Sequence, residues 1–204
     1  MELHTPFVAS VGIFDVADHL PYLRKLFADK VDALIMGAST PNRAYANFKT
    51  TMSVYKPLGG ISSLDESKEA DKLKDAIGAA AKEYANSCGY TGDKYNPIVV
   101  NFWLNEMESG QTHGYHNHAG MHFSGCIYVD MPENTSGIKF KSFKDRFDYI
   151  PLNIEKYTPL NAGSWVFSPS EGQLYIWESW LQHGVEAAEY TGVRRSIAFD
   201  VVMT

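Results

Sequence analysis

The sequence predicts an α+β fold in which a β-sandwich or jelly roll is braced on one face by helices. Two observations predict it. Residues 1–96 contain two segments with apolar side chains at helical spacing, and residues 97–204 consist of short β-rich runs separated by turn clusters. The 204 residues, 45% of them hydrophobic, suffice for one core. We therefore expect a single domain over 1–204, with 1–96 as helical support and edge strands and 97–204 as the β core.

The first elements are a strand and a helix. Residues 7–14 are rich in β-formers, and Asp15 or Asp18 can cap a helix that runs to about Ala33. The apolar positions of this helix are Leu20, Leu23, Phe27, Val31 and Leu34. Residues 37–63 are rich in Gly, Ser, Thr, Asn and Pro, which predicts a loop with one candidate strand over 49–55.

A second, stronger helix is predicted for Asp65–Ser87, because an apolar stripe recurs at helical spacing and Gly89 can end it. The stripe consists of Leu73, Ile77, Ala80, Ala81 and Tyr84. After it the pattern changes to short strands, which is typical of a sandwich or jelly roll. The predicted strands are 98–107, 121–130, 137–143, 164–169, 173–177 and 194–203.

Composition narrows the class of protein. The formal net charge is −6 and no Lys/Arg block occurs, so we expect no nucleic-acid partner. Cys88 and Cys126 are too few for a disulfide framework, and no apolar run approaches the roughly 20 residues of a membrane span. The N-terminus lacks the basic and apolar regions of a secretory signal. We expect a cytoplasmic protein with no membrane partner; the oligomeric state stays open.

Histidines mark the candidate site. Four of the seven lie within ten residues, His113, His116, His118 and His122, and His183 follows far downstream. Imidazole is the commonest side-chain metal ligand. If the stretch is extended, His116 and His118 point the same way, because strand side chains alternate. We predict His116, His118 and His183 as metal ligands, with no catalytic residue beyond them.

The metal itself stays open at this point. Two histidines and a carboxylate form the facial triad of non-haem iron oxygenases, but His118 stands where that carboxylate would be. Three imidazoles can hold Fe(II), and they also suit zinc. His113 and His122 are expected to be bystanders or neighbours of the ligands, and His4 and His19 ordinary surface residues.

The last predicted strand carries two arginines. Arg194, Ser196, Ala198 and Asp200 alternate with Arg195, Ile197, Phe199 and Val201. Small side chains at 196 and 198 leave space beside Arg194. Since a guanidinium grips a carboxylate through two hydrogen bonds, and a hydroxyl can add a third, Arg194 and Ser196 form a candidate clamp for a dicarboxylate. The alternative is a solvated arginine pair at a strand start.

Several segments together carry a resemblance. They are Trp103-Leu104-Asn105, His116-Asn117-His118, Ser124-Gly125-Cys126-Ile127-Tyr128-Val129, Pro132, Gly137, 172–175, 177–185 and 194–200. In this order, residues 97–204 resemble the 2-oxoglutarate/Fe(II)-dependent oxygenases of bacteria and their phages, in the double-stranded β-helix (jelly roll, cupin-like) superfamily. The resemblance implies Fe(II) near the three histidines. It implies 2-oxoglutarate with its far carboxylate on Arg194 and Ser196, and a hydrogen bond from Tyr128.

The resemblance also has departures. His118 replaces the usual aspartate, Glu178 stands where proline is commoner, and Asp200 where asparagine is commoner. The implied activity is a dioxygenase that uses O2, decarboxylates 2-oxoglutarate to succinate and hydroxylates an unknown small-molecule or residue substrate. The alternatives are a three-histidine cupin-like metalloenzyme independent of 2-oxoglutarate, and a non-enzymatic jelly-roll binding or structural protein.

The sequence suggests residues that line the pocket but does not identify the substrate. Candidate lining residues are Trp103, Asn105, His122, Cys126, Phe140, Trp177 and Trp180. A small basic cluster nearby could attract an anionic substrate, although a solvated strand face explains it as well. It consists of Lys139, Lys141, Lys144 and Arg146.

Overall fold

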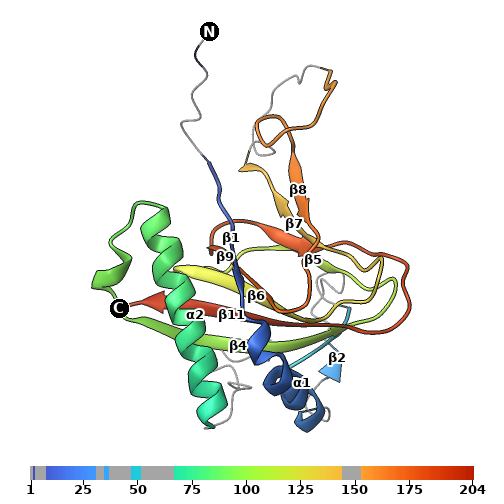
Figure 1. Cartoon of the computed structure of the whole chain (residues 1–204). Coiled ribbons are helices and arrows are strands. Elements are labelled where there is room, and N and C mark those ends of the chain that lie inside the picture. Colours follow the sequence, from blue (N-terminus) through green and yellow to red (C-terminus); the bar gives the residue numbers. More distant parts are fainter. Residues whose placement is uncertain (1, 3–7, 31–34, 37–46, 52–66, 144–152) are drawn as a thin grey trace.

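Two antiparallel sheets face each other in this computed structural model, which describes residues 2, 8–30, 35–36, 47–51, 67–143 and 153–204 (Figure 1). The larger sheet has the order β1 (Gly12–Asp15), β9 (Gln173–Glu178), β6 (Phe123–Asp130), β11 (Arg194–Met203), β4 (Pro97–Met107), β3 (Lys49–Thr50) and β2 (Ile35–Met36). The smaller sheet has the order β5 (His113–His116), β10 (His183–Val185), β7 (Ile138–Lys141) and β8 (Ser164–Phe167). This is the predicted jelly-roll arrangement.

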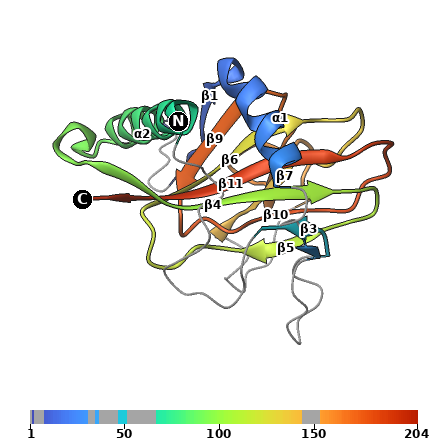
Figure 2. The ribbon, with the colours of Figure 1, turned by 90° about the horizontal axis from the view of Figure 1, so that it is seen from below.

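Helices cover the outer face of the larger sheet, and the smaller sheet lies on its other side (Figure 2). They are α1 (Leu20–Asp29), α2 (Lys68–Ser87) and the short 3-10 turns η1 (Ala17–His19) and η3 (Gly92–Lys94). The predicted helical support is therefore confirmed. Side chains of both α-helices join the core of the larger sheet, including Leu23, Leu73 and Ile77.

The two α-helices begin in different ways. Asp15 accepts a hydrogen bond from the Ala17 N–H (2.8 Å) in an Asx turn ahead of η1. Val16 and His19 occupy the N-cap positions of η1 and α1 without a side-chain cap, so the predicted capping by Asp15 or Asp18 is wrong; α1 has Pro21 in its first turn. The Ser67 hydroxyl accepts from the Ala70 N–H (3.2 Å), so α2 begins three residues later than predicted. Gly89, with φ of 85°, lies just beyond its end. The whole predicted stripe of α2 is buried.

Alternation along β6 shows how the strands separate two cores. Ile127 and Val129 face the helices, whereas Cys126 and Tyr128 face the smaller sheet. Gly125 lies opposite Phe199 in the antiparallel β6–β11 ladder, and an added Cβ there would overlap the Phe199 ring. The space between the sheets is thus lined by alternate residues of the central strands.

The six strands predicted for the second half are confirmed as β4, β6, β7, β8, β9 and β11, to within two residues at each end. The strands β5 and β10 were not predicted. Each has at most four residues, and each contains a glycine, which weakens a strand signal. Both carry histidines, so the site is built on the segments with the least strand character.

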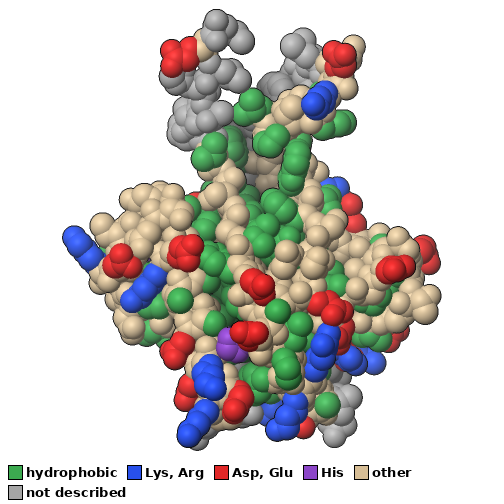
Figure 3. Space-filling model, in the orientation of Figure 1, with side chains coloured by type: hydrophobic (Ala, Val, Ile, Leu, Met, Phe, Trp, Pro, Cys, Tyr) green, Lys and Arg blue, Asp and Glu red, His purple; other side chains and the backbone are tan. Residues whose placement is uncertain are grey.

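Part of the first-half prediction lies outside the described residues. This holds for Phe7, for the helix beyond Lys30, for most of 37–63 and for His4. On the face shown in Figure 3, basic and acidic side chains are interspersed over the lower half, and hydrophobic ones gather above. None of the helices in the described ranges is long and apolar enough to cross a membrane.

Candidate functional site

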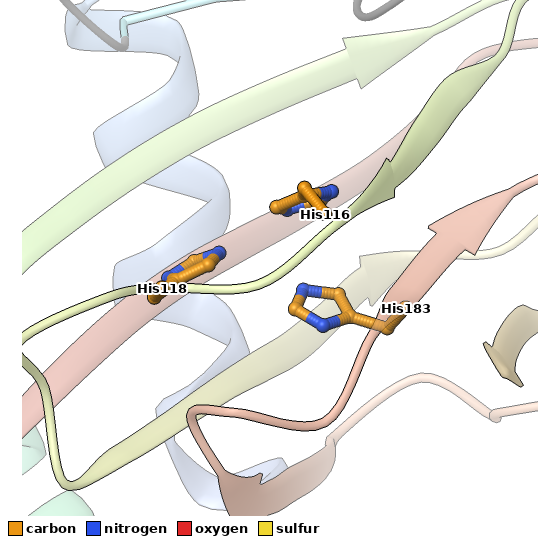
Figure 4. A group of neighbouring side chains, drawn as sticks. All are labelled: His116, His118 and His183. Atoms are coloured by element: carbon orange, nitrogen blue, oxygen red, sulfur yellow. The ribbon is translucent and has the colours of Figure 1, made fainter. Parts of the chain in front are cut away.

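Three histidines, from β5, from the segment just after it and from β10, point toward one another (Figure 4). His116 ends β5 and lies opposite His183, which begins β10, in the antiparallel ladder. His118 lies two residues further on, where its N–H donates to the Ser179 carbonyl (3.0 Å) in the segment between β9 and β10. Their candidate ligand atoms all lie within 4.8 Å of one another. The predicted histidine trio is therefore brought together.

Each imidazole of this trio is held through its Nδ1 atom. The Nδ1 of His116 lies 2.9 Å from the Gly114 carbonyl, and that of His183 lies 3.0 Å from the Leu181 carbonyl. The Nδ1 of His118 lies 2.5 Å from Oδ1 of Asp200. Carbonyl and carboxylate oxygens only accept, so each Nδ1 carries the proton and donates. The lone pair of each ring is then on Nε2, which is the arrangement that metal-ligating histidines show.

Burial favours the neutral form of two of these rings, those of His116 and His183. Burial, together with the neighbouring His118, lowers the pKa of His116 to about 4. Burial also lowers the pKa of His183 well below its usual value. A divalent cation needs deprotonated imidazole nitrogens, so near neutral pH no proton competes for these two rings.

The other two histidines of the cluster have different places. His113 is half-buried at the cavity wall, and its ring stacks on that of His116 with 4.1 Å between centroids. Burial lowers its pKa well below the usual value. His122 does not line the cavity; its Nδ1 accepts a hydrogen bond from the Met203 N–H (3.2 Å). His113 thus packs against the candidate ligand His116, and His122 connects the segment before β6 to the end of β11 by a hydrogen bond.

Sequence reasoning assigned no role to Asp200. This carboxylate is 2% exposed and accepts from Ser124 Oγ (2.7 Å) and Asn101 Nδ2 (2.9 Å) as well as from His118. The β11 ladder shifts register between Asp200 and Val201, and such bulges re-aim side chains beside active sites. The alternation that groups it with Arg194 was visible in the sequence, but its partner His118 was not.

Arg194 lies in the same cavity and has no carboxylate partner among the described residues. It is 3% exposed, and its Nη1 donates to Ser196 Oγ (3.2 Å) and contacts Met107 Sδ (3.3 Å). Its guanidinium stands 5.4 Å above the Tyr128 ring. Within the described part of the chain, Arg194 Nε and the Tyr128 hydroxyl are buried without a hydrogen-bond partner.

A buried cation with only neutral neighbours is costly unless an anion joins it. The Arg194 group therefore fits a ligand carboxylate, and Ser196 and Tyr128 can add hydrogen bonds. Arg195, by contrast, reaches Glu106 (2.7 Å) and Asp130 (3.2 Å) on the other face. The two neighbouring arginines thus have different roles.

The cavity between the sheets has a volume of about 280 Å³. This is near the lower end of the roughly 300–1,000 Å³ of small-molecule sites, so a small dicarboxylate fits. The candidates Trp103, Asn105, Cys126 and Trp177 line it, whereas Phe140 and Trp180 do not. Burial raises the pKa of the Cys126 thiol, which favours its neutral form.

Lining residues that the sequence reasoning missed include Phe48, Asn101 and Met107. Asn101, Trp103, Asn105 and Met107 alternate along β4, so strand parity from Trp103 could have found the first and last. Phe48 offered no such signal. Of the predicted basic cluster, Lys139 pairs with Glu186, and Lys144 and Arg146 lie outside the described residues.

Residues 101–200 match the family model described as "Putative 2OG-Fe(II) oxygenase". This segment contains the three histidines, Arg194, Ser196 and Asp200. A search of curated proteins gave no significant match. The family match favours 2-oxoglutarate-dependent chemistry over the alternatives of a cupin-like enzyme without this co-substrate and a non-enzymatic jelly roll.

Solved structures share the fold at low sequence identity. A Pseudomonas putida prolyl-4-hydroxylase matches with a TM-score of 0.60 and 10% identity, over 96% of this chain and 94% of that one. A 2OG-Fe(II) oxygenase family oxidoreductase from Burkholderia pseudomallei gives 0.61 and 13%, over 94% and 85%. The epimerase SnoN of nogalamycin biosynthesis gives 0.63 and 11%, over 95% and 78%. The likeness shows a double-stranded β-helix.

Proposed function

We propose which residues of this chain hold Fe(II) and 2-oxoglutarate, the two groups named by the 2OG-Fe(II) oxygenase family whose model matches residues 101–200. His116, His118 and His183 hold the metal through Nε2. Arg194 binds the far carboxylate of 2-oxoglutarate, helped by the hydroxyls of Ser196 and Tyr128.

One observation carries this proposal: a single cavity is lined by three Nδ1-anchored imidazoles and by a buried arginine that pairs with no carboxylate in the described part of the chain. Three protein ligands leave coordination positions for a chelating 2-oxo acid and O2. A dicarboxylate matches both ends of this arrangement, since one end can reach the metal while the other pairs with Arg194.

When bound, Fe(II) supplies O2 activation, which is coupled to the loss of CO2 from 2-oxoglutarate and leaves succinate and an oxidised substrate. The chain's own residues orient the reactants. Arg194 and Ser196 fix the co-substrate, and the buried indole of Trp177, whose ring centroid lies 4.6 Å from that of His183, helps to keep the cavity dry. The protein's share is thus ligation, orientation and exclusion of water.

We propose hydroxylation of a C–H bond as the outcome for the substrate. The structural neighbours include prolyl hydroxylases and an epimerase, so they favour no one substrate class. We also propose that residues 1–204 form one domain, which the shared core of α1, α2 and the larger sheet supports. A reducing, cytoplasmic setting suits Fe(II), and the thiols of Cys88 and Cys126 are free. An origin in bacteria or phages stays a prediction.

The test is an anaerobic titration of the purified protein with Fe(II) and 2-oxoglutarate. We expect a weak visible charge-transfer band from the chelated metal and, on admitting air, succinate formation. His183→Ala should abolish both. His19→Ala removes an imidazole far from the cavity and should change neither. A wild-type protein that shows no band and no metal-dependent rise in Tm contradicts the proposal.

A further inference from the structure

We propose that Asp200 supplies, through His118, the negative charge that a carboxylate ligand gives the facial triad directly. In this arrangement Asp200 is a positioning residue and does not touch the metal. The inference rests on the proposed metal site and adds to it a residue that sets the affinity and electron donation of one ligand.

The geometry singles out this pair. Two of the three imidazoles donate to backbone carbonyls, which are neutral, whereas His118 donates to a carboxylate at 2.5 Å. A charge-assisted hydrogen bond of this length is stronger than a neutral one. A carboxylate that accepts from Nδ1–H fixes the tautomer and raises the basicity of the opposite nitrogen. His118 is therefore expected to be the most strongly donating ligand of the three.

The charge balance of the cavity supports the same reading. Among the described residues that line it, Asp200 is the only carboxylate and Arg194 the only lysine or arginine. Arg194 is assigned to the co-substrate, so no other lysine or arginine among the described lining residues is available to neutralise Asp200. A buried carboxylate needs a countercharge as well as hydrogen bonds. A divalent cation on the far side of the His118 ring provides that countercharge.

The remaining contacts of Asp200 hold it in place. Ser124 Oγ donates to Oδ1, the same oxygen that accepts from His118, and Asn101 Nδ2 donates to Oδ2. Both oxygens are thereby fixed from β4 and β6, the two strands that flank β11. The orientation of the His118 ring thus depends on β4, β6 and β11, three neighbouring strands of the larger sheet.

The experiment measures Co(II) affinity, with Co(II) as an air-stable substitute for Fe(II), by competition with a chromophoric chelator. Asp200→Asn keeps the size and one acceptor atom but removes the charge. We expect it to weaken Co(II) binding by about 10- to 100-fold. Asp130→Asn makes the same chemical change at the Arg195 ion pair outside the cavity, and should leave Co(II) affinity within twofold.

A second background separates action through His118 from general damage. In His118→Asp the ligand itself carries the charge, so adding Asp200→Asn should leave Co(II) affinity unchanged or raise it. Equal losses in both backgrounds, or an Asp200→Asn protein that binds within threefold of wild type, overturn the inference. Failure of the wild-type protein to bind Co(II) instead contradicts the proposed function.

A measurement on the unmutated protein covers the case in which Asp200→Asn does not fold. In the Zn(II)-loaded protein with 15N-labelled histidine, the Nδ1–H proton of His118 should resonate further downfield than those of His116 and His183. Three equivalent shifts would overturn the inference, because they would mean that the carboxylate adds nothing to the bond.

Discussion

Arg194→Met tests the co-substrate clamp, because the structure predicts opposite effects on stability and on binding. In the absence of co-substrate, Arg194 is 3% exposed and its side-chain contacts, Ser196 Oγ and Met107 Sδ, are neutral. Methionine retains most of the apolar contact and removes a buried charge that no described residue pairs. The free energy of unfolding without ligand should therefore change by less than about 1 kcal/mol, or rise.

The effect on 2-oxoglutarate binding should be large. Removing one partner of a buried, hydrogen-bonded charge pair costs about 2–5 kcal/mol. This corresponds to a Kd for 2-oxoglutarate that is roughly 30- to 4,000-fold weaker. Calorimetric titration of 2-oxoglutarate into Mn(II)-loaded protein measures the affinity, and urea unfolding in EDTA measures the stability without metal.

Arg195→Met is the matched control, one residue away. Arg195 pairs with Glu106 and Asp130 on the opposite face of β11, and these side chains are 38%, 12% and 24% exposed. Its loss should lower the free energy of unfolding by about 1–2 kcal/mol, since partial exposure screens both pairs. Its Kd for 2-oxoglutarate should stay near wild type. The reasoning fails if Arg194→Met binds 2-oxoglutarate within threefold of wild type, or if it destabilises the ligand-free protein more than Arg195→Met does.

Three further outcomes are expected. The pKa of His116 is 6.5 in the unfolded chain and about 4 in the folded one, so the unfolded chain binds more protons between these pH values. The free energy of unfolding of the metal-free protein should therefore be highest above pH 6.5 and fall by on the order of 3 kcal/mol toward pH 4. In urea unfolding, His116→Gln should make this pH dependence shallower. Gly125→Ala should lower Tm steeply, since its Cβ would overlap the Phe199 ring; a Tm near wild type would refute the close packing. Ser67→Ala should cost about 1 kcal/mol by removing the α2 cap, and an unchanged midpoint in urea would contradict it.

The fold was predictable because its signals are local. The α2 stripe and the alternation of β11 each lie within one segment, and both patterns appear in the structure as read from the sequence. The end of α1 and the start of α2 were predicted less accurately. α1 ends at Asp29 and not near Ala33, and the Ser67 cap starts α2 at Lys68 and not at Asp65.

The site was only partly predictable, for a physical reason. His116, His118 and His183 are metal-binding residue types with short spacing, so they could be singled out without knowing the sheet order. Asp200 could be placed on the right face of β11, but its bond to His118 depends on strand order and on a bulge. Phe48, which packs edge-on against His113, comes from a two-residue strand region with no pattern. A residue that acts through a contact between strands far apart in the sequence cannot be recognised from the spacing of residues along the chain.

The position of β11 has a consequence for how the centre assembles. It is the last strand along the chain, yet it lies in the middle of the larger sheet, between β6 and β4 (Figure 1). It carries Arg194, Ser196 and Asp200. The rings of His116 and His183 are held by carbonyls two residues earlier and can be oriented locally. The ring of His118 and the carboxylate site at Arg194 form only once β11 is inserted. High-affinity metal uptake should therefore lag behind collapse of the earlier strands during refolding, and would act as a reporter of the final strand's insertion.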